Sequence, residues 1–160
     1  MHNLNLSILD ASAHEIISLR KAILRPSDPD TSWCSYAYDT DPRAVHLRAV
    51  VDGSSVGMIT LVPDGKAFPD GYEAMWRIRG LGVREPFRQK QIASDLIRTS
   101  LQKIADDPSG RQIWLSGRTT QTNLYQRHGF ERVGSEYNIA GTGPHYDFVL
   151  RGQSEHKRTS

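Results

Sequence analysis

The chain has 160 residues, of which 38% are hydrophobic and 24% are charged, and its formal net charge is +2. This length suits one domain around one core, and this composition excludes a disordered chain. A nucleic-acid-binding surface needs clustered basic residues, so the weak excess of positive charge leads us to expect no nucleic-acid partner.

The chain carries no sign of a membrane segment. No stretch approaches the ~20 consecutive apolar residues that a membrane span needs, and the N-terminal segment lacks the apolar run of a secretory signal. The single cysteine, Cys34, can form no internal disulfide, which fits a reducing compartment. We therefore expect a cytoplasmic protein with no membrane partner.

The first elements are a strand and a helix. Residues 4–9 alternate between apolar and polar side chains and predict a strand. Ser12 and Glu15 form an S-x-x-E capping box in front of a helical pattern, and this helix should end before Pro26.

A long loop and a hairpin follow. Residues 27–43 are rich in proline, aspartate and serine and predict an irregular segment, which at this length is typically functional or disordered. Its aromatic residues argue against disorder. Two alternating runs over 44–51 and 56–62, separated by the turn D-G-S-S, predict a β-hairpin.

The second half alternates strands with helices. We expect a strand over 74–83, a helix that begins near Ile92, and then a strand, a short helix and two strands over 111–117, 119–128, 130–140 and 145–151. This order predicts an α/β fold with a mixed, mostly antiparallel central sheet of about six to seven strands and helices on both faces. The single domain should span 1–151, and the polar tail over 152–160 should be flexible.

Two glycines, Gly80 and Gly82, interrupt the strand over 74–83. A strand loses side chains at a bulge, at a bend, or where a ligand or another backbone approaches closely. The next residues lead into a helix start, where free N–H groups and the helix dipole favour an anion. Arg88 and Lys90 add positive charge, so this turn is a candidate phosphate site. A solvated, charged helix start is the alternative.

Two motifs resemble those of the Gcn5-related N-acetyltransferase (GNAT) superfamily. They are V-x-x-x-x-R-x-x-x-x-A over 83–93 and L-Y-Q-R-H-G-F over 124–130. The order of the predicted elements agrees with that family over most of the chain, and the runs W-R-I-R-G-L-G-V and G-P-H-Y-D-F resemble its ElaA-type branch. The resemblance implies the GNAT fold, whose strands splay at the fourth strand. It also implies acetyl-coenzyme A as the acetyl donor and direct attack by an amine.

The resemblance also implies roles for the residues that match its motifs. The main chain of Leu81, Gly82 and Val83 would bind the pantetheine arm, and the Val83 N–H would stabilise the oxyanion. Tyr125 would donate a hydrogen bond or a proton to the departing thiolate. The remaining cofactor contacts, at the diphosphate turn and at the end of the fifth strand, would be Arg88, Gln89, Lys90, Gln91, Ile92, Ala93 and Arg118.

Two of these positions depart from the family pattern. Gln91 stands where glycine is usual, and a positive φ there would strain it by about 1–3 kcal/mol. We expect Gln91 to be helical, which would remove the strain. Arg118 stands where the family often has an asparagine that contacts the cofactor.

The general base is left open by the sequence. No carboxylate lies on the strand over 75–83, and a water chain or one of three side chains could serve: His46, His145 or Glu73. Arg79 and Arg118 are candidates to bind a carboxylate or phosphate on the acceptor. A buried structural ion pair is the alternative reading of the arginines on this strand.

Two classes of function remain after these observations. The first is an N-acetyltransferase acting on a small-molecule or peptide amine, with no metal. The second is a catalytically silent acyl-coenzyme A-binding or regulatory module, which the departure at Gln91 and the missing base favour. A homodimer through the late strands stays open beside a monomer.

Overall fold

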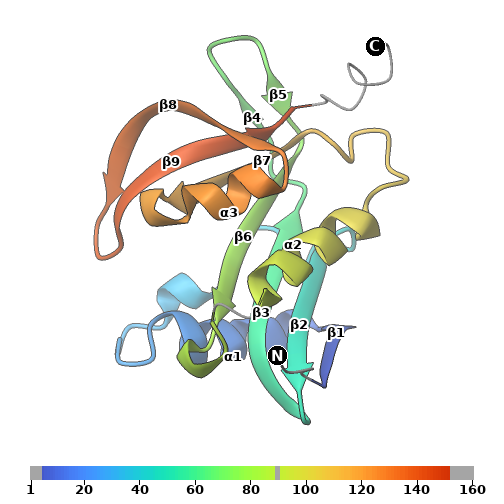
Figure 1. Ribbon diagram of the computed structural model, residues 1–160, viewed down its shortest axis with the longest axis vertical. Coiled ribbons are helices and arrows are strands. Elements are labelled where there is room, and N and C mark those ends of the chain that lie inside the picture. Colours follow the sequence, from blue (N-terminus) through green and yellow to red (C-terminus); the bar gives the residue numbers. More distant parts are fainter. Residues whose placement is uncertain (1–4, 89–90, 152–160) are drawn as a thin grey trace. The chain divides into compact units, whose positions relative to one another are not determined.

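The computed structural model describes residues 5–88 and 91–151 (Figure 1). The chain groups into two compact units. Unit 1 contains Met1–Pro63 and Arg79–Lys103, and unit 2 contains Asp64–Ile78 and Ile104–Ser160. A seven-stranded sheet has the strand order β1-β2-β3-β6-β7-β9-β8, and β6 (Trp76–Val83) contributes residues to both units.

Unit 1 is built on three antiparallel strands and the second part of β6. The three strands are β1 (Leu6–Asp10), β2 (Val45–Val51) and β3 (Ser54–Val62). The β2–β3 turn places Asp52 and Gly53 at φ 50° and 81°, the two left-handed residues of a tight hairpin turn. The predicted hairpin is therefore confirmed.

Two helices of 12 residues each complete unit 1: α1 (Ala13–Leu24) and α2 (Ile92–Lys103). The Ser12 hydroxyl accepts a hydrogen bond from the Glu15 N–H, and the Glu15 carboxylate accepts one from the Ser12 N–H, at 3.1 and 2.8 Å. This capping box begins α1, and the helix ends before Pro26, as predicted. Two 3₁₀ turns, η1 (Ser32–Cys34) and η2 (Glu85–Phe87), lie in the connecting segments.

The helices α1 and α2 cover opposite faces of β3 (Figure 1). Ile16 and Ile23 of α1 pack against Met58 in one buried cluster. The preceding residue, Gly57, faces α2, because a Cβ added there would lie 3.3 Å from Leu96. Since successive strand residues point to opposite faces, each face of β3 has its own helix.

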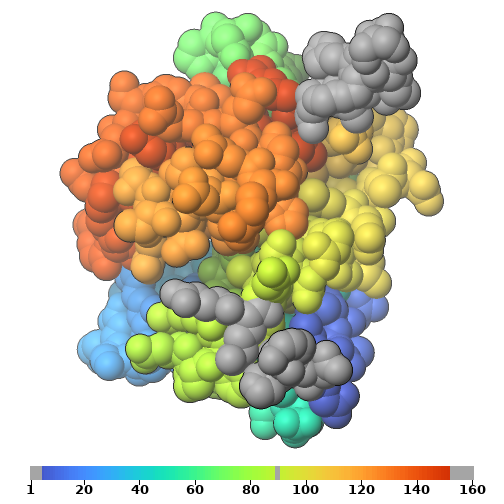
Figure 2. All heavy atoms as spheres, viewed as in Figure 1, coloured from blue at the N-terminus to red at the C-terminus, as the bar shows by residue number. Residues whose placement is uncertain are grey.

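Unit 2 contains the other strands and one short helix. β7 (Ile113–Arg118) runs parallel to β6, whereas β9 (Gly143–Leu150) is antiparallel to both β7 and the edge strand β8 (Phe130–Ile139). Helix α3 (Thr122–Arg127) follows a 3₁₀ turn, η3 (Thr119–Gln121). In Figure 2, α3 and β8 form the orange surface of this unit.

A small hairpin in unit 2 escapes the sequence analysis. It consists of β4 (Lys66–Ala67) and β5 (Glu73–Ala74). Strands of two residues are too short to show the alternation by which strands are recognised. The predicted strand over 74–83 accordingly begins at Trp76, because Ala74 belongs to β5.

The predicted fold class is confirmed: the sheet is mixed and mostly antiparallel, with helices packed against it. The single domain over 1–151 stays a prediction, and the tail over 152–160 lies outside the described residues. No helix in the described part of the chain is both long and apolar enough to cross a bilayer.

Candidate functional site

The ladder between β6 and β7 is short. It joins Trp76 to Ile113, Arg77 to Trp114 and Ile78 to Leu115, and it ends there. β6 continues to Val83, and β7 continues to Arg118 in its ladder with β9. The pairing with β7 thus stops within β6, the strand at which the resemblance implies that the sheet splays.

Gly80 and Gly82 have different structural roles. Gly80 has a φ of 65°, a left-handed conformation that few other residues adopt, and this kinks β6. At Gly82 a Cβ would lie 2.7 Å from the Leu24 Cδ2 and 3.0 Å from the Met58 Cε. Gly82 therefore lets α1 pack closely on β6. The space beside both glycines holds side chains of unit 1, so of the alternatives that the sequence leaves open, a bend describes Gly80 and close approach of another part of the chain describes Gly82.

A stacked arrangement of aromatic and cationic side chains lies beside Gly80. The Arg20 and Arg79 guanidinium carbons lie 3.7 and 4.1 Å from the centroid of the Tyr36 ring. A Cβ on Gly80 would lie 3.1 Å from the Tyr36 Cε2. The loop over 27–43 is thus held against β6 by cation–π contacts.

Arg20 anchors this loop through a buried polar network. Its side chain is fully buried and donates hydrogen bonds to both Asp39 carboxylate oxygens, at 2.7 and 2.9 Å. It also donates to the Thr60 hydroxyl at 2.8 Å and to the Cys34 carbonyl at 2.7 Å. Burial raises the pKa of Asp39, but the hydrogen bonds from Arg20 and from the Tyr36 N–H, together with the charge of Arg20, outweigh this effect and hold that pKa below its usual value.

His46 belongs to the same network. Its Nε2 lies 2.9 Å from the Asp39 carbonyl, which can only accept, so Nε2 carries the proton. Its Nδ1 lies 2.9 Å from the Thr60 hydroxyl. With the proton of the neutral ring on Nε2, Nδ1 is an acceptor, so the Thr60 hydroxyl donates to it. Both ring nitrogens are engaged, which argues against His46 as the base.

The predicted phosphate turn follows β6. Arg88 donates from Nε to the Val83 carbonyl at 2.8 Å, so its side chain turns back onto the end of β6. Gln89 and Lys90 lie outside the described residues. α2 begins at Ile92, whose side chain is buried, and the next residue, Ala93, is half-buried.

Our expectation that Gln91 is helical is wrong. Gln91 has a φ of 66°, in the left-handed region that favours glycine. Its carbonyl accepts the first helical hydrogen bond, from the Asp95 N–H at 3.0 Å. The chain therefore turns into α2 at this residue, as it would at the usual glycine. Because Gln91 has a Cβ, its backbone is strained in this conformation.

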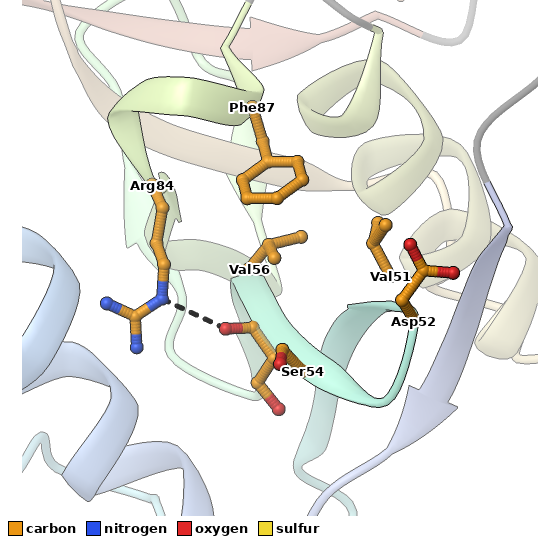
Figure 3. Close-up of a pocket in the computed structure, with 7 residues that line it drawn as sticks. Val51, Asp52, Ser54, Val56, Arg84 and Phe87 are labelled. Atoms are coloured by element: carbon orange, nitrogen blue, oxygen red, sulfur yellow. Dashed lines mark hydrogen bonds between the residues drawn. The ribbon is translucent and has the colours of Figure 1, made fainter. Parts of the chain in front are cut away.

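A hollow opens between η2 and the β2–β3 hairpin (Figure 3). The Arg84 N–H donates to the Val56 carbonyl at 2.7 Å, and the Arg84 Nε donates to the Ser55 carbonyl at 3.0 Å. The Phe87 ring lies above Val56 on the apolar side of the hollow. These bonds fix η2 on β3 and so fix the start of the turn that leads to α2.

In unit 2, Tyr125 of α3 is buried beside β9 and β7. Its ring centroid lies 5.0 Å from that of Phe148. Burial raises the pKa of Tyr125 to about 12, although the charge of Arg118 lowers it. The phenol is thus neutral near pH 7, and it suits hydrogen-bond donation better than full proton transfer.

Gly117 of β7 is needed for this position of Tyr125, and the sequence analysis missed it. A Cβ at Gly117 would lie 2.5 Å from the Tyr125 Cε2. The run L-S-G inside a predicted strand was the available signal, since glycine in a strand often marks a close approach.

The three arginines considered from the sequence have different surroundings. Arg77, the other arginine on β6, pairs with Asp64 at 3.5 Å and lies over the Trp114 ring at 4.3 Å, which is an ion pair that is half-buried rather than buried. Arg79 contacts Tyr36 in unit 1, and Arg118 is exposed at the end of β7 in unit 2. Recognition of one acceptor group by Arg79 and Arg118 stays a prediction.

Unit 2 contains a polar network of its own, built from side chains of β4, β7, β8 and β9. The Asp147 carboxylate accepts hydrogen bonds from the Lys66 ammonium at 2.6 Å and the Tyr137 hydroxyl at 2.5 Å. The Tyr137 and Ser116 hydroxyls lie 2.5 Å apart. We call Ser116, Tyr137, Asp147 and Lys66 the Asp147 cluster.

Two candidate bases from the sequence lie in unit 2. His145 is buried, and its ring stacks on Tyr137 with centroids 6.2 Å apart. Its Nδ1 lies 2.9 Å from the Gly143 carbonyl, so Nδ1 carries the proton and Nε2 is the basic nitrogen. Glu73 lies in β5 and is exposed.

The structure belongs to a well-populated fold. A family model described as the acetyltransferase (GNAT) family matches residues 11–130. The chain is 27% identical over 141 residues to the uncharacterised N-acetyltransferase YitI of Bacillus subtilis, covering 88% of this chain and 92% of YitI.

Two solved structures illustrate the likeness in fold. Escherichia coli ElaA superposes with a TM-score of 0.68 at 18% identity, over 89% of this chain and 97% of ElaA. Arabidopsis thaliana NAA60, solved in complex with acetyl-coenzyme A, superposes with a TM-score of 0.64 at 18% identity, over 90% of this chain and 97% of NAA60.

Proposed function

Because this chain belongs to the acetyltransferase (GNAT) family, we propose that it transfers the acetyl group of acetyl-coenzyme A to a primary amine of a small molecule or peptide. The amine attacks the thioester directly. The observation that carries this proposal is the early end of the β6–β7 ladder at Ile78, next to a family motif over 83–93.

The residues present fit this cosubstrate. β6 extends from Arg79 to Val83 beyond its last pair with β7, so its main chain can pair with the amide groups of the pantetheine arm. Leu81, Gly82 and Val83 would supply these groups, and the Val83 N–H would bind the developing oxyanion.

The turn into α2 would bind the diphosphate. The left-handed Gln91 brings the chain into α2, where the first N–H groups of a helix are free to bind an anion. Arg88, Gln91, Ile92 and Ala93 would bind there together with Gln89 and Lys90, and Arg118 is the further contact proposed from the sequence.

Acetyl-coenzyme A supplies an activated thioester. The protein positions it, keeps Tyr125 neutral by burial, and offers the phenol as a hydrogen-bond donor to the thiolate as the thioester breaks. A donor with a pKa near 12 holds its proton, so its contribution is mainly electrostatic.

The test begins with binding. Saturating acetyl-coenzyme A, at a hundred times its Kd, should stabilise the protein by about 2.7 kcal/mol, which raises Tm by several degrees. Acetate at the same concentration is the control. A Tm that does not respond to millimolar acetyl-coenzyme A would contradict the proposal.

Transfer is tested second, as thiol release over a panel of small primary amines and short peptides. Amine-dependent release identifies the enzyme. Binding without release from any member of the panel would instead identify a silent acyl-coenzyme A-binding module. The cytoplasmic location and the homodimer stay predictions from the sequence.

A further inference from the structure

The base that the sequence left open has a structural candidate in the Asp147 cluster. The β7–β9 ladder pairs Ser116 with Asp147 directly. In the β8–β9 ladder, Val133 pairs with Asp147 and Tyr137 pairs with His145, so β8 bulges between Val133 and Tyr137. Bulges commonly re-aim a side chain near a functional site. This bulge sets the Tyr137 hydroxyl between Ser116 and Asp147.

The hydrogen bonds of the cluster have one direction. The Asp147 Oδ2 pairs with the Lys66 ammonium at 2.6 Å, and its Oδ1 accepts a hydrogen bond from the Tyr137 hydroxyl at 2.5 Å. Tyr137 has a single hydroxyl proton, which this bond uses. The short contact with Ser116 is therefore a bond that Ser116 donates to the Tyr137 oxygen. The Ser116 oxygen, which can still accept a hydrogen bond, is the outer end of this series of hydrogen bonds.

Tyr137 must pass a proton on rather than hold the negative charge. Burial raises its pKa, and the hydrogen bond to Asp147 raises it further, so it is a neutral phenol near pH 7. The other charged or titratable groups near it are Lys66 of β4, His145 of β9, and Arg77 of β6, whose charge lowers this pKa. Arg77 is itself paired with Asp64.

The hydrogen-bonded series Ser116, Tyr137 and Asp147 lies where it could remove a proton from an amine. Ser116 directly follows Leu115, the last residue of β7 that pairs with β6. The next residue, Gly117, faces Tyr125, so Ser116 lies on the opposite face of the sheet. Ser116, which would accept the amine proton, and Tyr125, which would donate to the thiolate, thus lie on opposite faces of the sheet. A proton therefore does not pass directly between them.

We propose that Ser116, Tyr137 and Asp147 form a proton relay that deprotonates the acceptor ammonium. This inference rests on the proposed acetyl transfer. As the ammonium approaches, its proton moves to the Ser116 oxygen, the Ser116 proton moves to Tyr137, and the Tyr137 proton moves to Asp147. The freed amine attacks the thioester: the C–N bond forms and the C–S bond breaks, and the second nitrogen proton is lost to water and taken up by the thiolate, so coenzyme A leaves as the thiol. Asp147 then releases its proton to water.

The first test uses the pH dependence of transfer. Asp147→Asn and Tyr137→Phe should lower kcat/KM about a hundredfold or more near pH 7, the usual scale of general base catalysis. The deficit should shrink about tenfold per pH unit towards the pKa of the amine, near 10.4 for a lysine-like acceptor, because free amine then forms in solution. A merely structural defect would lower the rate by one factor at every pH.

The second readout needs no cosubstrate. Tyrosinate absorbance of the free protein, with Tyr137→Phe as the blank, reports the Tyr137 titration. Asp147→Asn should lower the pKa of Tyr137, and Ser116→Ala should raise it, because these neighbours shift it in opposite directions. Unchanged titration in both variants would overturn the relay.

Matched controls lie in the same unit. Tyr146→Phe removes a hydroxyl from the neighbouring residue of β9, and Asp70→Asn removes an exposed carboxylate that pairs with Arg151. Both should keep the wild-type pH profile, and all variants should keep the wild-type response of Tm to acetyl-coenzyme A.

The possible failures are distinguishable. A wild-type protein that binds and transfers, with Asp147→Asn and Tyr137→Phe equally active at all pH values, overturns the relay and leaves the proposed function intact. A deficit that shrinks with rising pH only in His145→Gln would assign the base to His145 and also overturn the relay. A wild-type protein that does not bind acetyl-coenzyme A overturns both.

Discussion

Gln91 holds a conformation that suits glycine better than any other residue. Its φ of 66° places the backbone in the left-handed region while its carbonyl accepts the first hydrogen bond of α2. The turn is therefore kept although the glycine is absent. The strain implies that the surrounding turn, anchored by Arg84 on β3, determines the conformation of Gln91.

Replacing Gln91 by glycine should stabilise the protein by about 1 kcal/mol. The removed strain of about 1–3 kcal/mol outweighs the backbone entropy of glycine, about 0.5–1 kcal/mol. Urea unfolding measures the difference. Gln91→Ala is the control and should give no gain, because alanine keeps the Cβ. A loss of stability in the glycine variant would show that the Gln91 side chain makes a needed contact.

Gly117→Ala should reduce the rate of acetyl transfer, because it displaces Tyr125. The new methyl group would lie 2.5 Å from the Tyr125 Cε2, so the ring must move, at a cost of about 1–3 kcal/mol for overpacking. The rate of thiol release should fall, while the Kd for acetyl-coenzyme A, measured by calorimetry, should stay within a few fold of the wild-type value.

The double variant distinguishes this positioning role from general damage. In a Tyr125→Phe background, Gly117→Ala should reduce release little further, because neighbouring residues with one shared role are not additive. Fully additive losses would contradict the positioning role of Gly117.

At the scale of elements, Arg20 joins α1, the loop over 27–43 and β3. It is fully buried and bonds Asp39 from the loop and Thr60 from β3. Removal of one partner from a buried ion pair leaves an uncompensated charge, which costs about 3–5 kcal/mol. The loop should therefore depend on this pair for its order.

Asp39→Asn should accordingly lower the free energy of unfolding by about 3–5 kcal/mol at pH 7. The pKa of Asp39 is lowered in the folded state. Its contribution is therefore complete above the unfolded pKa of about 3.9 and is lost as the pH falls through the lower folded value. The difference between variant and wild type should thus narrow below about pH 4.

Asp41→Asn in the same loop is the matched control. Asp41 pairs with Arg43, whose side chain is 65% exposed, and such surface pairs contribute about 0–1 kcal/mol. Urea unfolding at several pH values measures both variants. Equal losses in the two variants would contradict the anchoring role of the Arg20–Asp39 pair.

At the scale of the whole molecule, β6 supplies residues to both units. A strand shared in this way couples the units, because neither keeps its sheet intact when β6 detaches. We therefore expect one cooperative unfolding transition, in line with the single domain predicted over 1–151.

Tryptophan positions allow this coupling to be measured. Trp33 lies in unit 1, whereas Trp76 and Trp114 lie in unit 2. In Trp33→Phe the fluorescence reports unit 2 alone, and far-UV circular dichroism reports both units. The two transitions should coincide. Separate midpoints would divide the chain into two independently folding parts.

The sequence by itself determined what depends on neighbouring residues. The capping box at Ser12, the turn at Asp52 and Gly53, and the alternation of the main strands predicted elements that the structure contains. The motifs over 83–93 and 124–130 identified the family for the same reason, since each lies within one short segment.

Only the tertiary structure decided which distant residues meet. The Asp147 cluster joins side chains from β4, β7, β8 and β9, and it depends on strand register and on a bulge that no local pattern encodes. The contact of Gly117 with Tyr125 was likewise decided by packing, and the left-handed φ of Gln91 is seen only in the structure. Hydrophobic periodicity and capping act over a few residues, whereas register, close approach and backbone strain are set by the sum of contacts across the fold.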